Sequence, residues 1–167
     1  MSETELNLES VEVSSSPLER FEEYLDSRGK RVTQQRRFIV EKVFSRHEHF
    51  EVDDLVAELV HAEQPVKVSR PTIYRTITEM VEAGLLRKIS LVGRTVYEHD
   101  YGYPQHDHLY CQTCQKLIEF QSKELIELRK SIAIEHEFLA KSFRLIINGV
   151  CKECQDARRK RRKVDRV

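Results

Sequence analysis

The chain has 167 residues, 40% of them hydrophobic, with 28 basic and 28 acidic residues. No apolar run approaches the roughly 20 residues that a membrane-spanning helix needs, which excludes an integral membrane protein. The first residues are acidic where a secretory signal would be basic and then apolar, so we expect a cytoplasmic protein. Residues 1–27 hold eight acidic residues and one basic residue, whereas residues 156–167 hold seven basic and two acidic. We predict an acidic disordered head over 1–15 and a basic tail over 156–167, a solvated segment that can also add salt-dependent affinity for DNA.

Three amphipathic helices are predicted in the first part of the chain. The first begins after Ser16, where Ser, Pro and Glu form a capping box, and it ends at Gly29. Thr33 can cap the second helix, and the third begins near Asp53. Their apolar residues recur at helical spacing, so each helix has one face to bury.

A fourth helix, from Ser69 to Gly84, carries the most informative pattern. A buried stripe runs through Ile73 and Ile77, and the opposite side is small, hydroxylated and cationic. Residues 86–89 and 95–97 read as two strands joined by a turn at 92–94. Four helices and a hairpin predict a winged helix-turn-helix domain over residues 16–97. The side chains expected on the outer side of the fourth helix are Thr72, Arg75, Thr76 and Glu79, with Tyr74 on the flank.

This order of elements is typical of proteins that insert one helix into the major groove of DNA. Arg75 can pair with a guanine or a phosphate, and Tyr74 can contact a phosphate or a thymine methyl group. Arg94, in the turn of the hairpin, can follow the DNA backbone. The alternative is a protein-binding or purely structural helical module.

A polar, aromatic stretch over 98–107 reads as a hinge, and a second domain over 108–155 follows. Strands are predicted at 108–111, 116–120 and 143–147, with a helix over 122–136. About 45 residues are too few for a stable core, so this domain needs a staple or a partner.

All four cysteines lie in two C-x2-C motifs within this second domain. Two pairs of thiolates suit tetrahedral zinc, with each motif supplying two ligands from a tight turn. Two disulfides or a redox pair are the alternative, but a cytoplasmic chain keeps its thiols reduced and redox motifs usually occur singly. We therefore predict one structural Zn²⁺ per chain, held by Cys111, Cys114, Cys151 and Cys154.

Two H-x-H pairs, His47 with His49 and His106 with His108, form a second group. On an extended segment the residues of such a pair face the same way, and the carboxylates of Glu98 and Glu119 are near the second pair in sequence. Ordinary surface histidines are the alternative. Imidazole with carboxylate suits Fe(II), Mn(II) or Zn(II), so a metal bound here would be exchangeable.

These motifs together resemble the ferric uptake regulator (Fur) family of metal-dependent repressors, from Arg31 through Cys154. The most specific matches are Thr72-Ile73-Tyr74-Arg75, Ala83-Gly84-Leu85-Leu86 and the run from His106 to Cys114, followed by Ile118-Glu119-Phe120. The resemblance implies an α+β fold: an N-terminal winged helix-turn-helix DNA-binding domain and a small C-terminal α/β dimerisation domain stapled by zinc. It also implies a homodimer that binds palindromic double-stranded DNA operators when loaded with metal.

The resemblance further assigns residues. A regulatory metal would be held by His49, Glu98, His106, His108 and Glu119, and DNA would be contacted by Tyr74, Arg75 and Arg31. Many members have an additional site that uses the position of Asp107, but its other positions here appear as Gln105, Ile126 and Phe143, so we expect it to be absent.

The class of metal follows from departures within the family. The peroxide-sensing branch typically has Asp at the positions of Glu98 and Glu119, and the zinc-sensing branch often recruits a Cys near the hinge, where residues 99–105 contain none. Fe(II) is therefore favoured, with Zn(II) uptake control, manganese or peroxide sensing as alternatives. Two rival functions are a zinc hydrolase built on the His and Glu cluster and a zinc-stapled protein-interaction module without a DNA role. We predict that the protein is not an enzyme.

Overall fold

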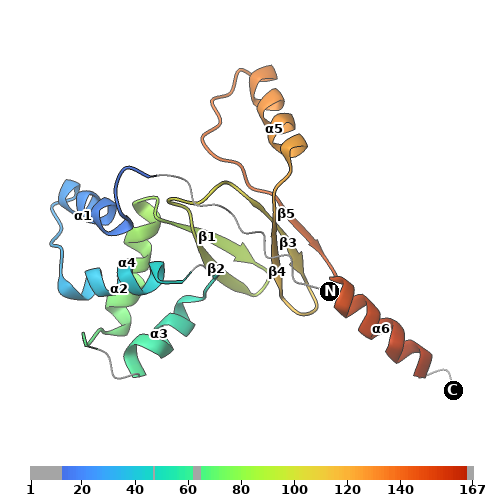
Figure 1. Ribbon diagram of the computed structural model, residues 1–167, viewed down its shortest axis with the longest axis horizontal. Coiled ribbons are helices and arrows are strands. Elements are labelled where there is room, and N and C mark those ends of the chain that lie inside the picture. Colours follow the sequence, from blue (N-terminus) through green and yellow to red (C-terminus); the bar gives the residue numbers. More distant parts are fainter. Residues whose placement is uncertain (1–12, 47, 62–64, 165–167) are drawn as a thin grey trace. The chain divides into compact units, whose positions relative to one another are not determined.

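The computed structural model describes residues 13–46, 48–61 and 65–164 (Figure 1). They form two compact units, one ending at Pro104 and one beginning at Gln105. Among these residues, helices and strands are mixed as the sequence predicted, which confirms the α+β class. None of the described helices is both long enough and apolar enough to cross a membrane.

The first unit consists of four helices and a hairpin, and its local signals act as predicted. The Ser16 side chain accepts a hydrogen bond from the backbone N–H of Glu19, which completes the capping box. Thr33 and Ser69 cap later helices in the same way. Gly84 has a φ of +72°, a left-handed conformation that ends the fourth helix at little cost. The elements are α1 (Pro17–Ser27), α2 (Gln34–Phe44), α3 (Val52–His61), α4 (Arg70–Glu82), β1 (Leu86–Leu91) and β2 (Arg94–His99).

The hydrophobic core of this unit lies between the four helices and the base of the hairpin. Fully buried side chains come from every helix and from β1, and the antiparallel strands β1 and β2 pair from Leu86 with His99 to Leu91 with Arg94. The hairpin is thereby fixed to the helices at its base. The largest buried side chains include Phe21, Leu25, Ile39, Leu59, Ile73, Ile77 and Met80.

The structure corrects the predicted outer side of α4. Thr76 is completely buried, and its hydroxyl donates a hydrogen bond to the backbone carbonyl of Thr72 at 2.8 Å. Glu79 is also buried, with 3% of its surface exposed. The prediction that Thr76 and Glu79 face outward is wrong, because α4 packs against α2, α3 and β1 and buries more than one stripe.

The second unit is a small three-stranded sheet with two helices. The strand order is β4-β3-β5, in which β3 pairs antiparallel with β4 and parallel with β5. None of the residues of α5 is buried, whereas β3 is buried at four of its five positions. The elements are β3 (Asp107–Cys111), β4 (Leu117–Phe120), α5 (Lys123–Glu135), β5 (Ile146–Gly149) and α6 (Lys152–Val164).

Two elements of this unit differ from the sequence-based expectation. The last strand was predicted over 143–147 but begins at Ile146, and just before it the backbone N–H of Leu145 is bound by the Asp107 carboxylate at 2.9 Å. The basic segment from 156 to 164 continues α6, which projects from the end of β5 in Figure 1. Lys, Arg and Ala are good helix formers, so a helix started by the second cysteine motif can run on into this segment.

Candidate metal centres and nucleic-acid interface

The four cysteines converge although 36 residues separate the two motifs. Cys111 ends β3 and lies opposite Gly149 of the neighbouring parallel strand β5, so the two motifs meet at the same end of the sheet. All four sulfur atoms lie within 4.8 Å of one another, and Cys114 Sγ is 3.7 Å from Cys151 Sγ. A tetrahedron with Zn–S bonds of about 2.3 Å has sulfur atoms about 3.8 Å apart, so the arrangement fits zinc.

The chemistry of the cysteines also fits a metal centre. All four are free thiols rather than disulfides. Backbone N–H groups of Cys114 and Cys151 point at the sulfur of Cys111 and lower its pKa to about 6, which favours the thiolate that zinc requires. The Cys151 thiol instead has a raised pKa, chiefly because it is hydrogen-bonded to the Glu153 carboxylate.

In the first unit, a backbone bridge brings together one histidine and one carboxylate. Phe50 and Tyr97 exchange both backbone hydrogen bonds, at 3.1 and 2.8 Å, which joins the segment before α3 to β2. Their neighbours His49 and Glu98 consequently meet, with His49 Nε2 3.1 Å from Glu98 Oε2. The other oxygen of Glu98 lies 3.7 Å from Arg87 Nη1. This imidazole and carboxylate form the first half of the predicted regulatory set.

The second half of the set lies in the second unit. The rings of His106 and His108 are 4.9 Å apart in an edge-to-face arrangement, as expected for residues two apart on a strand. Glu119 on β4 pairs in register with His108, and its Oε1 lies 3.7 Å from His106 Nε2. Two imidazoles and one carboxylate therefore share one face of the sheet.

Two histidines outside these groups, His99 and His136, have other surroundings. His99, which the sequence left undecided, stacks on Phe44 with ring centroids 4.5 Å apart, and its Nε2 lies 3.1 Å from the carbonyl of Val43. It therefore packs within the first unit. His136 caps the C-terminus of α5. His47 lies outside the described residues.

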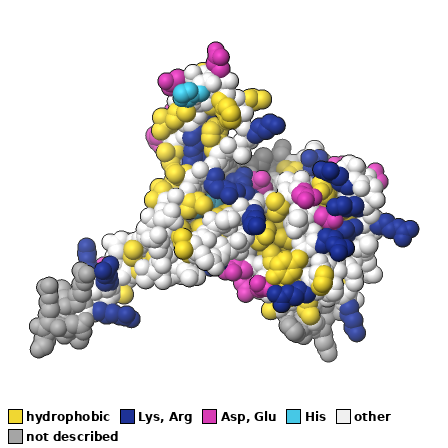
Figure 2. Space-filling model, turned by 180° about the vertical axis from the view of Figure 1, so that it is seen from behind, with side chains coloured by type: hydrophobic (Ala, Val, Ile, Leu, Met, Phe, Trp, Pro, Cys, Tyr) yellow, Lys and Arg dark blue, Asp and Glu magenta, His cyan; other side chains and the backbone are white. Residues whose placement is uncertain are grey.

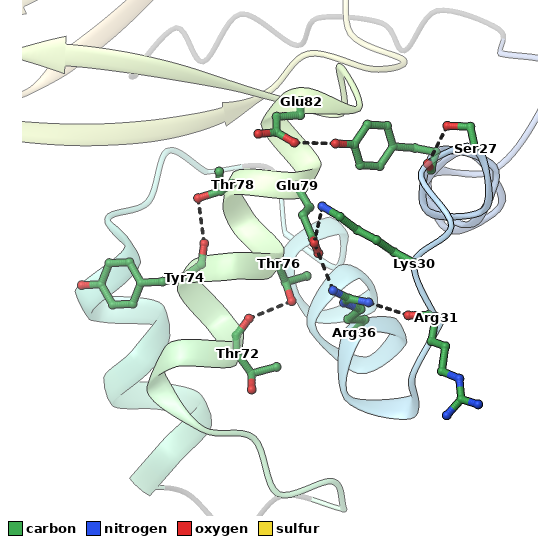
Figure 3. Close-up of polar contacts among 11 residues, drawn as sticks. Ser27, Lys30, Arg31, Arg36, Thr72, Tyr74, Thr76, Thr78, Glu79 and Glu82 are labelled. Atoms are coloured by element: carbon green, nitrogen blue, oxygen red, sulfur yellow. Dashed lines mark hydrogen bonds and ion pairs between the residues drawn. The ribbon is translucent and has the colours of Figure 1, made fainter.

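The surface of α4 presents part of the predicted DNA-binding set. Tyr74 and Arg75 are exposed and Thr72 is half-buried, while Arg31 is exposed in the segment that joins α1 to α2. Figure 3 shows the Tyr74 ring extending from α4 on the side opposite α2. Thr76 is excluded from direct contact by its burial.

Two acidic residues belong to this surface although the sequence analysis assigned them no such role. The Tyr74 hydroxyl donates a hydrogen bond to Asp53 Oδ1 at 2.6 Å, and Arg94 pairs with Glu51 at 3.3 Å. Arg94 therefore folds back from the hairpin turn, in which Val92 and Gly93 are exposed. These pairs join residues more than 20 positions apart, so no local sequence signal marks them. The residues of these two pairs line an open cleft of about 470 Å³.

The chain combines a winged helix with a small sheet domain that carries a four-cysteine cluster and a His and Glu cluster. This combination defines a class of metal-binding helix-turn-helix proteins. The model of the ferric uptake regulator family matches residues 27–148. The chain belongs to that family.

Individual relatives agree with this assignment. The chain is 30% identical over 143 residues to the ferric uptake regulation protein of Campylobacter jejuni, covering 86% of this chain and 91% of the relative. It is also 30% identical over 149 residues to the peroxide-responsive repressor PerR of Staphylococcus aureus, covering 88% and 99%. The structure of the Helicobacter pylori ferric uptake regulator, 21% identical, superimposes with a TM-score of 0.73 and covers 87% of this chain and 96% of that one. This last likeness shows the fold.

Proposed function

We propose that this protein is a metal-responsive repressor that binds palindromic operators as a metal-loaded homodimer and controls genes of metal uptake and homeostasis. One observation carries the proposal: each unit holds a preassembled group of N/O donors, His49 with Glu98 in the first and His106, His108 with Glu119 in the second. Members of the family are transcription regulators, and we propose no catalytic role.

The length of the connecting segment permits the two groups to share one ion. Glu98 and His106 are eight positions apart, so the connecting backbone can span at most about 27 Å. A divalent ion held by ligands on both sides of this connection would restrict the two units to one arrangement, which couples metal occupancy to DNA affinity. The ion would supply coordination bonds only, and the arrangement that it favours would be the one that binds the operator.

We propose Fe(II) as the regulatory metal, from the identity of two ligands and the absence of a third ligand type near the hinge. Imidazole and carboxylate bind Fe(II), Mn(II) and Zn(II), so ligand type alone leaves zinc uptake control and manganese or peroxide sensing as alternatives. The equal identity to an iron regulator and to a peroxide-responsive repressor does not separate them. The glutamates at positions 98 and 119 and the lack of a cysteine in 99–105 favour iron.

We propose that Cys111, Cys114, Cys151 and Cys154 hold one structural Zn²⁺ per chain. It would join the end of β3 to the segment between β5 and α6, at the place where a sheet of three short strands has little core of its own. This zinc is independent of the regulatory ion because softer sulfur ligands bind it more permanently.

The exposed apolar side chains of the second unit support a homodimer. Leu128 and Ile132 lie one helical turn apart on α5 and are 54% and 48% exposed, and Ile147 on β5 is 46% exposed. Figure 2 shows hydrophobic side chains on the surface of α5. A sheet domain this small gains stability by covering such a surface with a second copy.

We propose that α4 of each protomer enters a major groove, with Tyr74 and Arg75 at its exposed side, Thr72 beside them and Arg31 on the phosphate backbone. Arg94 would reach the backbone once its pair with Glu51 opens. Because a two-fold dimer reads a two-fold sequence, the operator is palindromic. A repressor of this type acts on the chromosome, in the cytoplasm.

The test is elemental analysis before and after mild chelation, with DNA binding followed by fluorescence anisotropy as Fe(II), Zn(II) and Mn(II) are titrated back. We expect about one zinc per chain to survive chelation and a second metal to restore tight binding, the most effective ion naming the sensor class. DNA affinity that ignores the second metal would contradict metal sensing.

A further inference from the structure

The helix that we propose enters DNA, α4, carries a buried carboxylate. Glu79 on α4 has a side chain that is only 4% exposed. A buried carboxylate is stable only when it is paired, because it has lost its hydration. Its Oε1 receives two cationic partners, Lys30 Nζ at 2.9 Å and Arg36 Nη2 at 3.0 Å.

The second partner extends the contact to the backbone of another segment. Arg36, on α2, is 13% exposed, and its Nη1 donates a hydrogen bond to the carbonyl oxygen of Arg31 at 2.5 Å. The planar guanidinium therefore bridges the α4 carboxylate and the segment that joins α1 to α2. Lys30, the residue before Arg31, binds the same carboxylate, so Glu79 holds this segment through two connections (Figure 3).

The cluster divides the basic residues of this region into two groups. Lys30 and Arg36 are committed to Glu79, which raises the pKa of Lys30 through their hydrogen bond. Arg31 contributes its backbone carbonyl to the cluster, and Figure 3 shows its side chain pointing away from it. The guanidinium of Arg31 is therefore exposed to solvent, while the backbone that carries it is fixed by the contacts of Lys30 and Arg36 with Glu79.

We propose that Glu79 is a positioning residue for DNA binding, which holds the Lys30–Arg31 segment against α4 so that Arg31 and the exposed side of α4 meet the phosphate backbone as one preorganised surface. This inference rests on the proposed DNA-binding function. The recognised chemistry is the phosphodiester backbone of duplex DNA, so the effect does not depend on base sequence.

Neutralising Glu79 should change the affinity for DNA in the direction opposite to that expected from net charge alone. Removing an acidic residue near bound DNA normally strengthens binding, because it makes the surface more positive. If Glu79 positions Arg31, neutralising Glu79 instead weakens DNA binding. The Lys30–Arg31 segment must then lose its freedom when DNA binds, which costs binding free energy.

The experiment uses the full chain loaded with Mn(II) and a mixed-sequence duplex of about 30 base pairs, with affinity measured by fluorescence anisotropy. We expect Glu79→Gln to weaken binding by about tenfold, the loss typical of one phosphate contact that is no longer preorganised. Glu82→Gln is the matched control: it removes the same charge from the same helix, but Glu82 is exposed and pairs with Tyr24. The control should bind as tightly as the wild type or more tightly. Equal or tighter binding by Glu79→Gln would overturn the proposal.

A double-mutant cycle separates positioning from simple destabilisation. Arg31→Ala should weaken binding strongly in the wild type and little in Glu79→Gln, whereas its effects should add in Glu82→Gln. If Glu79→Gln does not fold, Arg36→Lys serves instead, since a lysine keeps the charge but cannot bridge Glu79 and the Arg31 carbonyl. Additivity in both cycles would overturn the inference while leaving DNA binding intact. A wild-type chain that fails to bind the duplex at low salt would contradict the contact with the DNA backbone on which this inference rests, and metal-dependent binding to a palindromic operator would then test the proposed function separately.

Discussion

Asp107 and Arg129 form an ion pair in which Asp107 Oδ2 lies 2.5 Å from Arg129 Nη2, joining β3 to α5. The other oxygen of Asp107 accepts the backbone N–H of Leu145 at 2.9 Å. Because side chains alternate along a strand, this carboxylate faces away from His106 and His108. The pair therefore fixes the strand from the side opposite to the candidate metal ligands.

Breaking this pair should destabilise the second unit. The side chains of Asp107 and Arg129 are 5% and 14% exposed, so Arg129→Met leaves a buried carboxylate without its cation. We expect a loss of about 3 kcal/mol in the free energy of unfolding, measured by urea denaturation. Arg20→Met, which breaks an exposed pair with Glu23, is the control and should cost less than about 1 kcal/mol. Equal losses in the two variants would contradict this role.

Removal of one cysteine should abolish the folded dimer. The affinity of a structural zinc site is largely folding free energy, and Cys114→Ser takes one of four ligands from the site that joins β3 to α6. Zinc content by elemental analysis should fall together with the dimer fraction in analytical ultracentrifugation. A zinc-free variant that remains a folded dimer would show that the cysteines are not a structural staple.

Removal of a regulatory ligand should have a different effect. His108→Ala removes one imidazole of the His106–His108 pair but leaves the cysteine cluster intact, so the dimer should stay folded and retain its zinc. Its DNA affinity should no longer rise when Fe(II) or Mn(II) is added. His136→Ala, which changes an exposed histidine at the end of α5, is the control and should respond like the wild type. Our division between structural and sensing sites fails if His108→Ala still responds.

The basic helix should contribute salt-dependent affinity for DNA. Arg158, Arg159, Lys160 and Arg161 are exposed on α6. Replacing all four with Gln should reduce the slope of log affinity against log salt by up to about 3.6, since each phosphate contact contributes about 0.9. Binding measured by anisotropy between low and moderate salt gives this slope. An unchanged slope would mark the helix as a solvated extension.

The elements predicted correctly from sequence depend on local chemistry. Capping by Ser16, Thr33 and Ser69 requires only the next three residues, so the helix starts could be read directly. The C-x2-C spacing likewise predicts that the cysteines act together, and the four sulfur atoms lie within 4.8 Å of one another. The convergence of the two motifs then follows from the parallel pairing of β3 with β5.

The errors concern residues whose partners are distant in sequence. Helical periodicity assigned Glu79 to the outside of α4, since it cannot register Lys30 and Arg36, which lie more than 40 positions away. Thr76 was assigned to the outside because periodicity does not show that α4 packs against α2, α3 and β1. A helix packed on several sides buries small polar residues whose hydroxyl is satisfied by the preceding turn, as that of Thr76 is by Thr72. The pairing of Tyr74 with Asp53 was likewise not accessible from sequence.

The central claim is that His49 with Glu98 and His106 with His108 and Glu119 hold one and the same regulatory ion. Calorimetric titration of Mn(II) into zinc-loaded protein tests it most directly, using the wild type, His49→Ala and His106→Ala. We expect one Mn(II) site per chain in the wild type, strongly weakened in both variants. Two independent sites, with each variant losing a different one, would contradict it.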